Sequence, residues 1–312
     1  MTDYRRPGDV RVILHGGKAE PALLRPALAR LRDQGHALHV SPTFEAGDAA
    51  RLAWEAGWVG CEGVVAAGGD GTLHEVVAGL LALEEGERPW LGVVPLGTGN
   101  DFATAAGLVP EDLGEALEVA IHGPLRDLDV IAAAGRPVLN MATGGAVTGI
   151  TAETPEALKA LLGRVAYVLM GLGRADRLRP HELVVKGPGL EWHGRALAYG
   201  VANGRTAGGG VVVAPDATAD DGLLDVAVLP HPGADEQASL LRLFLEEGLG
   251  EGEGILRWRV PWVELSTRSG IPLDLSLDGE PETFESGRAR MEVLPGALRF
   301  RAPVGSGLFG GG

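Results

Sequence analysis

Short apolar runs alternate with helix-like segments along the first hundred residues of this chain. The segment 21–33 carries Leu24, Leu28 and Leu31 at helical spacing. The run 63–67 is apolar, which is typical of a strand buried on both faces. Strands are predicted at 10–14, 37–40, 63–67 and 91–95, and helices at 21–33, 47–56 and 73–83. This alternation predicts a parallel sheet covered by helices.

Two glycine-rich turns follow the third and fourth predicted strands. Residues 68–72 read GGDGT, and residues 96–100 read LGTGN. Glycine permits positive φ and leaves room for backbone N–H groups to approach phosphate oxygens, and a following helix adds its positive N-terminal end. Ligands of open α/β sheets bind beyond the carboxyl ends of the strands. Both turns are therefore expected to face one site.

The first turn by itself leaves two interpretations open. Thr72 and Glu75 have the T-x-x-E spacing of a capping box, so a plain strand-to-helix turn with a helix from Leu73 explains it. An anion site explains it equally well, although the segment has neither a Walker lysine nor a dinucleotide fingerprint. The second turn favours the anion site, because two glycine-rich loops at one edge of a sheet occur by chance less often than one. Capping of the next helix by Asn100 or Asp101 is compatible with ligand binding.

From about Asp129 the pattern changes to short β-type segments separated by Gly, Pro and Asp. Strands are expected at 196–202, 211–214, 223–229 and 271–277, and helices at 155–172 and 234–247, while 306–312 is expected to fray. We therefore predict an α/β domain over residues 1–128 and a mostly β domain over 129–312. The last residues are candidates to return to the first domain.

The charge balance of the chain restricts its partners. The formal net charge is −15 and the pI is near 5.0. Nucleic acid is disfavoured as a partner, because its binding depends on Lys and Arg neutralising phosphates. Long-range attraction to anionic lipid is disfavoured as well. Contact of a local patch with a membrane remains compatible with this charge, and we expect such contact to be transient.

Cysteine usage and apolar content indicate the compartment. Cys61 is the single cysteine, so no intramolecular disulfide can form, and no Cys/His cluster has metal-ligand spacing. Residues 1–9 lack the apolar region of a signal peptide, and no stretch reaches the ~20 apolar residues of a membrane-spanning helix. The expected location is the cytoplasm, with peripheral and transient contact at the inner membrane surface.

Two acidic turns lie in the second half of the chain. Residues 277–280 read LDGE, and residues 220–222 read DDG. On local physics we favour plain turns for both, since Asp-Gly is a strong hairpin signal. In a phosphoryl-transfer enzyme, however, Glu280 is a candidate base for the attacking hydroxyl. Asp221 would suit an oxygen-preferring ion such as Mg²⁺.

Several segments together resemble the bacterial diacylglycerol-kinase-like lipid kinases, in particular the YegS type. They are GGDGTLHEV, PLGTGNDFATAAGL, LNMATGG, ITAETPEALKALLGRVAY, NGRTAGGG, ADDGLLDV, LDGEPE and EVLPGALRFR. GGDGT alone is shared with NAD kinases, whereas NDFAT and LDGEPE look like the YegS type. The resemblance implies an N-terminal nucleotide-binding domain of the NAD kinase/diacylglycerol kinase type, a C-terminal β-sandwich domain, and a cleft between them where ATP meets a lipid hydroxyl.

The resemblance also implies roles for individual residues. Glu280 would accept the proton of the hydroxyl, and Asp70 would be needed for the use of nucleotide or metal. A Mg²⁺ ion, or alternatively Ca²⁺, would be held by Asp221 and by the backbone carbonyls of Thr218 and Leu223. The implied ATP contacts are Thr43, Gly69, Asp70, Gly71, Thr72, Leu73, His74, Glu75 and Thr98.

The implied activity is ATP- and Mg²⁺-dependent phosphorylation of a free lipid hydroxyl, as in phosphatidylglycerol or diacylglycerol, and likeness to the YegS type favours phosphatidylglycerol. His74 and His15 stand where the family usually has Asn. Imidazole is bulkier and titrates near neutral pH, so nucleotide geometry or pH dependence can differ here. Two alternatives stay open: phosphorylation of a soluble acceptor such as NAD, and a nucleotide-binding module without catalysis.

Overall fold

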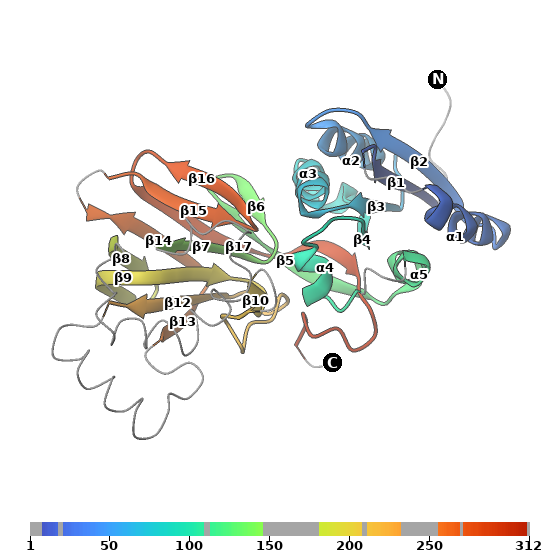
Figure 1. Cartoon of the computed structure of the whole chain (residues 1–312). Coiled ribbons are helices and arrows are strands. Elements are labelled where there is room, and N and C mark those ends of the chain that lie inside the picture. The colour runs from blue at the N-terminus through green and yellow to red at the C-terminus, as the bar shows by residue number, and fades with distance from the viewer. Residues whose placement is uncertain are drawn as a thin grey trace. The chain divides into compact units, whose positions relative to one another are not determined.

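The chain divides into two compact units in the computed structural model (Figure 1). The structure describes residues 8–17, 21–108, 113–145, 181–207, 211–231, 255–268 and 271–310. Unit 1 consists of Met1–Leu139, Thr218–Gly222 and Leu294–Gly312, and unit 2 consists of Asn140–Ala217 and Leu223–Val293. The boundary expected after residue 128 falls inside strand β5 (Leu125–Ala133), which belongs to unit 1. Two segments from later in the chain complete that unit.

The sheet of unit 1 contains four parallel strands in the order β2–β1–β3–β4. They are β1 (Asp9–His15), β2 (Ala37–Thr43), β3 (Gly63–Gly68) and β4 (Trp90–Pro95). Strand β17 (Arg288–Arg301) runs parallel to β4, with Phe300 opposite Leu91. Strand β5 pairs with β17 and with β6 (Arg136–Val138). The predicted parallel sheet is confirmed.

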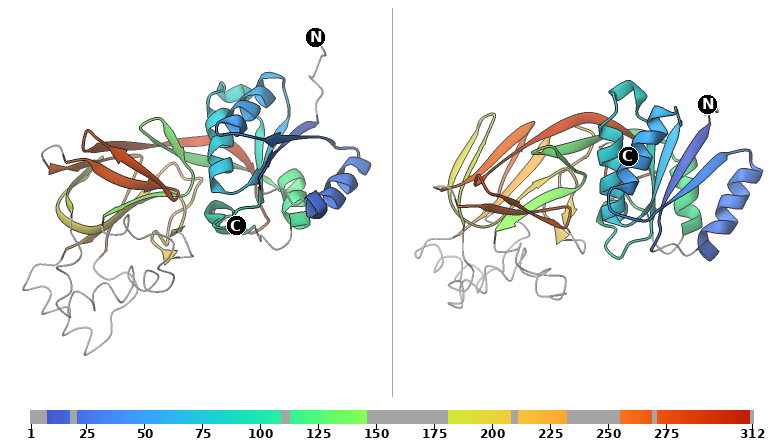
Figure 2. Two further views of the ribbon diagram at one scale, coloured as in Figure 1. Left: turned by 45° about the horizontal axis from the view of Figure 1, so that its top comes forward. Right: turned by 90° about the horizontal axis from the view of Figure 1, so that it is seen from above.

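Helices cover both faces of this sheet (Figure 2). They are α1 (Pro21–Asp33), α2 (Asp48–Trp58), α3 (Asp70–Leu81), α4 (Asp101–Ala105) and α5 (Leu113–His122), with a 3-10 turn at Glu85–Glu87. Alternate residues of β3 serve the two faces. Val64 and Ala66 share a core with α2 and α3, whereas Val65 and Ala67 share a core with α1 and α5. The apolar run 63–67 is therefore buried on both sides, as its sequence predicts.

Residues 306–310 are packed rather than frayed, so the expectation of a frayed segment 306–312 was wrong for these residues, and 311–312 lie outside the described residues. Leu308 and Phe309 are buried in the core of unit 1. The hydroxyl of Ser306 donates a hydrogen bond to the carbonyl of Ala106 (2.7 Å), and the N–H of Ala219 donates to the carbonyl of Leu308 (2.8 Å). Burial of two large apolar side chains outweighs the conformational freedom of the surrounding glycines.

Unit 2 is built from antiparallel strand pairs. Its strands are β7 (Met141–Gly145), β8 (His181–Gly187), β9 (Leu190–Ala202), β10 (Thr206–Ala207), β11 (Val211–Val212), β12 (Leu224–Pro230), β13 (Leu256–Val260), β14 (Trp262–Thr267), β15 (Leu273–Leu277) and β16 (Glu280–Phe284). The long strand β9 pairs with β7, β8 and β12, which makes it the centre of the unit. The first part of β17 pairs with β14. The prediction of a mostly β second half is confirmed.

The two helices expected at 155–172 and 234–247 lie outside the described residues. Within the described part of the chain, no helix combines the length and the apolar character needed to cross a bilayer.

Candidate active site

The carboxyl ends of four neighbouring strands meet at one edge of the unit 1 sheet. In the register of the parallel pairs, Thr43 of β2 lies opposite His15 of β1, and Gly68 of β3 lies opposite Pro95 of β4. The loops that follow these strands therefore emerge side by side. This edge is where open α/β sheets bind their ligands.

Helix α3 begins inside the first glycine loop. Its N-cap is Gly69 and its first residue is Asp70, so the helix starts three residues before the expected Leu73. The predicted capping box was wrong, because the N-cap is Gly69, which has no side chain to cap the helix, and Thr72 lies within the first turn. The Thr72 side chain packs on Gly68, where a Cβ would lie 2.5 Å from it. The N–H groups of the first turn have no partner within the helix, which suits an anionic ligand.

Glu75 contacts the neighbouring helix instead of its own N-terminus. Its Oε2 accepts a hydrogen bond from the N–H of Ala49 in the first turn of α2 (3.1 Å). A carboxylate at that position also complements the positive end of the α2 dipole. Glu75 thus joins α2 to the helix that starts in the glycine loop, a contact that the T-x-x-E spacing did not indicate.

The second loop is folded around the side chain of Asn100. This buried residue is the N-cap of α4 and has a left-handed backbone (φ 51°, ψ 42°), which Asn tolerates better than most residues. Its Oδ1 accepts the N–H of Gly97, and its Nδ2 donates to the carbonyl of Gly97, both at 2.8 Å. Thr98 and Gly99 are exposed at the tip. The loop is therefore closed on itself and presents Thr98 outward.

The two glycine loops touch each other. The N–H of Leu96 donates to the carbonyl of Gly68 (2.8 Å). A Cβ on Gly97 would lie 2.6 Å from Cα of Gly69, and a Cβ on Gly99 would lie 3.0 Å from Oδ2 of Asp70. Only glycine allows backbones to approach this closely. The expectation that the two turns lie together is confirmed, with the Asp70 carboxylate beside the second loop.

The loop after β1 lies against the end of β2. The N–H of Gly16 donates to Oγ1 of Thr43 (3.4 Å), and a Cβ on Gly16 would overlap the carbonyl oxygen of Thr43. The N–H of Gly17 donates to Nδ1 of His15 (3.2 Å), so this ring serves the loop as an acceptor. His74 is half-buried on α3. Thr43, the loop 69–75 and Thr98 are thus all placed along one edge of the sheet.

The acidic turn near residue 220 belongs to unit 1 and is organised by a residue that the sequence did not single out. Asp129 is buried, and it accepts the N–H groups of Gly222 and Gly296, each at 2.7 Å. Burial raises the pKa of its carboxyl, against the effect of these two hydrogen bonds. The hydroxyl of Thr218 donates to Oδ2 of Asp221 (2.6 Å). Leu223 follows as the first residue of the next segment of unit 2.

A salt bridge also ties this turn to strand β5, and a hydrogen bond ties it to the C-terminal segment. Asp220 pairs with Arg126 (2.9 Å) and accepts the N–H of Gly310 (2.8 Å). The guanidinium of Arg126 lies 5.1 Å from the centre of the Phe309 ring. Residues 218–222 are therefore fixed to unit 1 from two sides.

The turn before Glu280 is held rigidly within unit 2. Asp278 and Gly279 have positive φ (47° and 92°), as a two-residue hairpin turn requires, and Leu277 lies opposite Glu280. Oδ1 of Asp278 accepts the N–H groups of Asn140 (3.0 Å) and Met141 (2.7 Å). The hairpin is thereby attached to the start of β7, and Glu280 is exposed at its end.

Comparison with known proteins agrees with this architecture. The family model "Diacylglycerol kinase catalytic domain" matches residues 9–133, and "YegS C-terminal NAD kinase beta sandwich-like domain" matches residues 143–302. A "Probable lipid kinase YegS-like" of Pseudomonas syringae pv. syringae is 46% identical, covering 96% of this chain and 95% of the relative. One from Yersinia enterocolitica is 41% identical, covering 96% of this chain and 98% of the relative.

Solved structures share the fold. That of a diacylglycerol kinase from Bacillus anthracis str. Sterne has a TM-score of 0.69 at 21% identity, covering 95% of this chain and 97% of the other. Family models match both halves of the chain, and the relatives named as probable lipid kinases match it over nearly its full length. This chain belongs to the YegS-type lipid kinases of the diacylglycerol-kinase-like family.

Proposed function

We propose that this chain transfers the γ-phosphate of ATP to a free hydroxyl of a membrane lipid of the phosphatidylglycerol or diacylglycerol type. The observation that carries the proposal is the contact between the two glycine loops at the carboxyl edge of the sheet. Glycine in both loops leaves room for phosphate oxygens to approach the backbone N–H groups of the first turn of α3. A lipid acceptor is suggested by the names of the relatives, which are probable lipid kinases.

On the nucleotide side, we assign the phosphates to the first turn of α3 and to the second loop. The contacts assigned are Thr43, Gly69, Asp70, Gly71, Thr72, Leu73, His74, Glu75 and Thr98. The helix N-terminus and its N–H groups stabilise negative charge, which is most of what a phosphoryl-transfer enzyme must do. Glu75 would act partly by positioning α3, since its carboxylate already accepts a hydrogen bond from the N–H of Ala49 in α2.

A cation fits beside the first loop. The loop has no lysine, and the Asp70 carboxylate faces the second loop. Carboxylate oxygens are the ligands that Mg²⁺ prefers, so Asp70 would hold the ion that accompanies ATP. When bound, this ion neutralises charge on the β- and γ-phosphates.

Glu280 is the proposed proton acceptor. It is exposed at the start of β16, on a hairpin that Asp278 fixes to β7. A carboxylate on a rigid turn can take the proton of the lipid hydroxyl without a large loss of side-chain freedom. The hydroxyl oxygen bonds to the γ-phosphorus as the bond from that phosphorus to the β–γ bridging oxygen breaks, and ADP leaves without a phosphoenzyme being formed.

We assign a second divalent cation, Mg²⁺ or Ca²⁺, to Asp221 and to the carbonyls of Thr218 and Leu223. These donors are all oxygens, as hard cations require. The Thr218 hydroxyl already bonds Asp221 and keeps the carboxylate within the turn. Because Asp129 and Arg126 anchor the same turn, the role proposed for this ion is structural or regulatory.

The proposal is tested by incubating the protein with γ-labelled ATP and Mg²⁺ in a total bacterial lipid extract, with NAD in a parallel reaction. Chromatography should show a labelled lipid. Labelled NADP without labelled lipid would instead establish a soluble acceptor. Binding of ATP with no labelled product, in Mg²⁺ or Ca²⁺, would establish a nucleotide-binding module without catalysis.

A further inference from the structure

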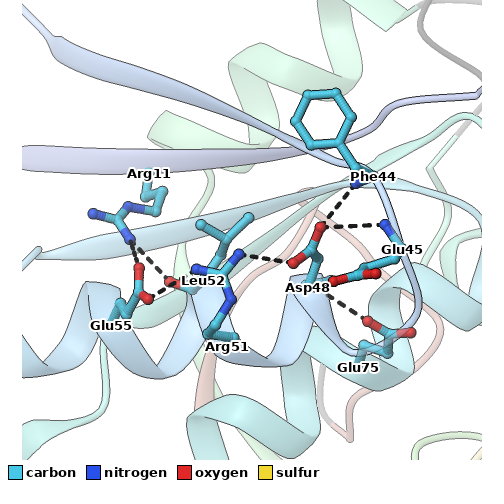
Figure 3. A network of polar contacts seen from close by, with 9 residues as sticks. Arg11, Phe44, Glu45, Asp48, Arg51, Leu52, Glu55 and Glu75 are labelled. Carbon is cyan, nitrogen blue, oxygen red and sulfur yellow. Dashed lines mark hydrogen bonds and ion pairs between the residues drawn. The ribbon is translucent and has the colours of Figure 1, made fainter.

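Phe44 lies at the carboxyl edge of the unit 1 sheet and is almost entirely exposed. It follows Thr43, the last residue of β2, and its relative exposure is 89%. In the close view its ring points away from the polar network beneath it (Figure 3). Single exposed apolar residues are common, so exposure alone assigns no role. The position and the support of this ring are what distinguish it.

The backbone that carries the ring is held firmly. Oδ2 of Asp48 accepts the N–H groups of Phe44 (2.9 Å) and Glu45 (3.2 Å), and Oδ1 accepts Nη2 of Arg51 (2.7 Å; Figure 3). The Arg51 hydrogen bond, followed by the two backbone N–H groups, lowers the pKa of Asp48 to about 2. The carboxylate is therefore charged at neutral pH. Only the two torsions of the Phe44 side chain are left to be ordered by a ligand.

The same segment adjoins the loops assigned to the nucleotide. Gly16, the first residue of the loop after β1, lies against Thr43 and at that position places no side chain on the end of β2. Glu75 accepts the N–H of Ala49 and so joins α2 to α3. Two strand spacings, about 10 Å, separate β2 from β3 across the sheet. A nucleotide held by its phosphates at the β3 loop can extend its ribose and base over that distance.

We propose that Phe44 stacks on the base of the bound nucleotide. This inference rests on the proposed function, because it takes the phosphates to occupy the loops after β3 and β4. A flat apolar ring on a fixed backbone suits a flat π ligand, and stacking on aromatic side chains is tolerant of base identity. Phe44 therefore contributes affinity for nucleotides and little discrimination between adenine and guanine.

Equilibrium binding of ATP and of inorganic tripolyphosphate, at equal free Mg²⁺, tests the proposal. Phe44→Ala should bind ATP about 5- to 100-fold more weakly and tripolyphosphate as tightly as wild type. With lipid acceptor, its KM for ATP should rise while kcat stays unchanged. Phe44→Trp should keep ATP affinity, and ATP should quench its added fluorescence relative to wild type. Trp58→Ala is the matched control: Trp58 is 65% exposed on α2 and stacks on Trp54.

The outcomes separate this role from the kinase activity itself. If Phe44→Ala binds ATP with wild-type affinity, or loses tripolyphosphate in step with ATP, the stacking role is overturned and the kinase proposal stands. An equal loss of ATP affinity in Trp58→Ala also overturns the stacking role. If wild-type protein binds neither ATP nor tripolyphosphate, the nucleotide site is overturned, and the stacking role with it.

Discussion

Replacing Glu75 by alanine should loosen the attachment of α2 to α3. Glu75 Oε2 accepts the N–H of Ala49 at 3.1 Å, and Ala49 is 2% exposed, so this N–H cannot readily turn to water. A hydrogen bond to a charged group contributes about 1.5–3 kcal/mol, and a buried donor left unsatisfied costs ~1–3 kcal/mol. Because Glu75 is itself half-buried, we expect Glu75→Ala to lower the free energy of unfolding by about 1–2 kcal/mol.

Urea unfolding of the full chain, followed by circular dichroism, measures this change. Glu75→Gln keeps an acceptor and should lose less than about 1 kcal/mol. Glu55→Ala is the control, because the Glu55 side chain is 39% exposed and its contacts are ion pairs with the partly buried Arg11 (3.5 Å) and the exposed Arg51 (2.9 Å). Such pairs contribute at most about 1 kcal/mol. Wild-type stability in Glu75→Ala would refute the reasoning, and weaker ATP binding at unchanged stability would show that the carboxylate serves the nucleotide directly.

Three further substitutions test the contact between the glycine loops, the proton acceptor Glu280, and Asp48, which holds the backbone at Phe44. Gly97→Ala places a Cβ 2.6 Å from Cα of Gly69, so thermal melts should show a loss of about 1–3 kcal/mol and titrations weaker ATP binding. Gly86→Ala, whose Cβ meets nothing within 4 Å, should change neither; equal effects in both variants would contradict the close contact. Glu280→Gln should leave ATP binding intact and lower kcat by roughly 10²–10⁴-fold, and full activity would exclude its role as base. The pKa of Asp48 is lowered to about 2, so its contacts stabilise the fold above the unfolded pKa of ~3.9 and this stability is lost as pH falls through about 2. Asp48→Asn should reduce the fall in stability over that range in acid titrations, and an unchanged slope would contradict this.

The arrangement of unit 1 could be predicted because its signals are local. The segment 21–33 forms a helix with the bounds that its leucine spacing indicates. The run 63–67 is buried on both faces, as continuous apolar sequence predicts. The two glycine loops could be placed at one edge because the carboxyl ends of parallel strands share an edge. Local pattern and topology were sufficient for these features.

Other features depend on partners that are distant in the sequence. The T-x-x-E spacing suggested a cap, but the carboxylate of Glu75 bonds Ala49, 26 positions away. Asp278 accepts the N–H groups of Asn140 and Met141, which precede it by 138 and 137 positions. Asp129 accepts the N–H groups of Gly222 and Gly296, which follow it by 93 and 167 positions. No local pattern reveals such pairs.

The start of α3 and the end of the chain were missed for a related reason. The glycines of 68–71 indicated a turn that ends before a helix at Leu73, and the glycines of 306–312 indicated a frayed end. In the fold, Gly69 is the N-cap of α3, and Leu308 and Phe309 are buried between other segments of unit 1. Tertiary packing determines the conformation at these positions, and it overrides local propensity.

The central claim is phosphoryl transfer from ATP to a lipid hydroxyl. The most direct measurement is incorporation of label from γ-labelled ATP into purified phosphatidylglycerol and diacylglycerol, each in mixed micelles with Mg²⁺, by wild type and Glu280→Gln side by side. We predict a labelled phospholipid with wild type and a roughly 10²–10⁴-fold slower reaction with Glu280→Gln. Wild-type protein that binds ATP yet labels neither lipid nor any component of a total lipid extract would contradict the claim.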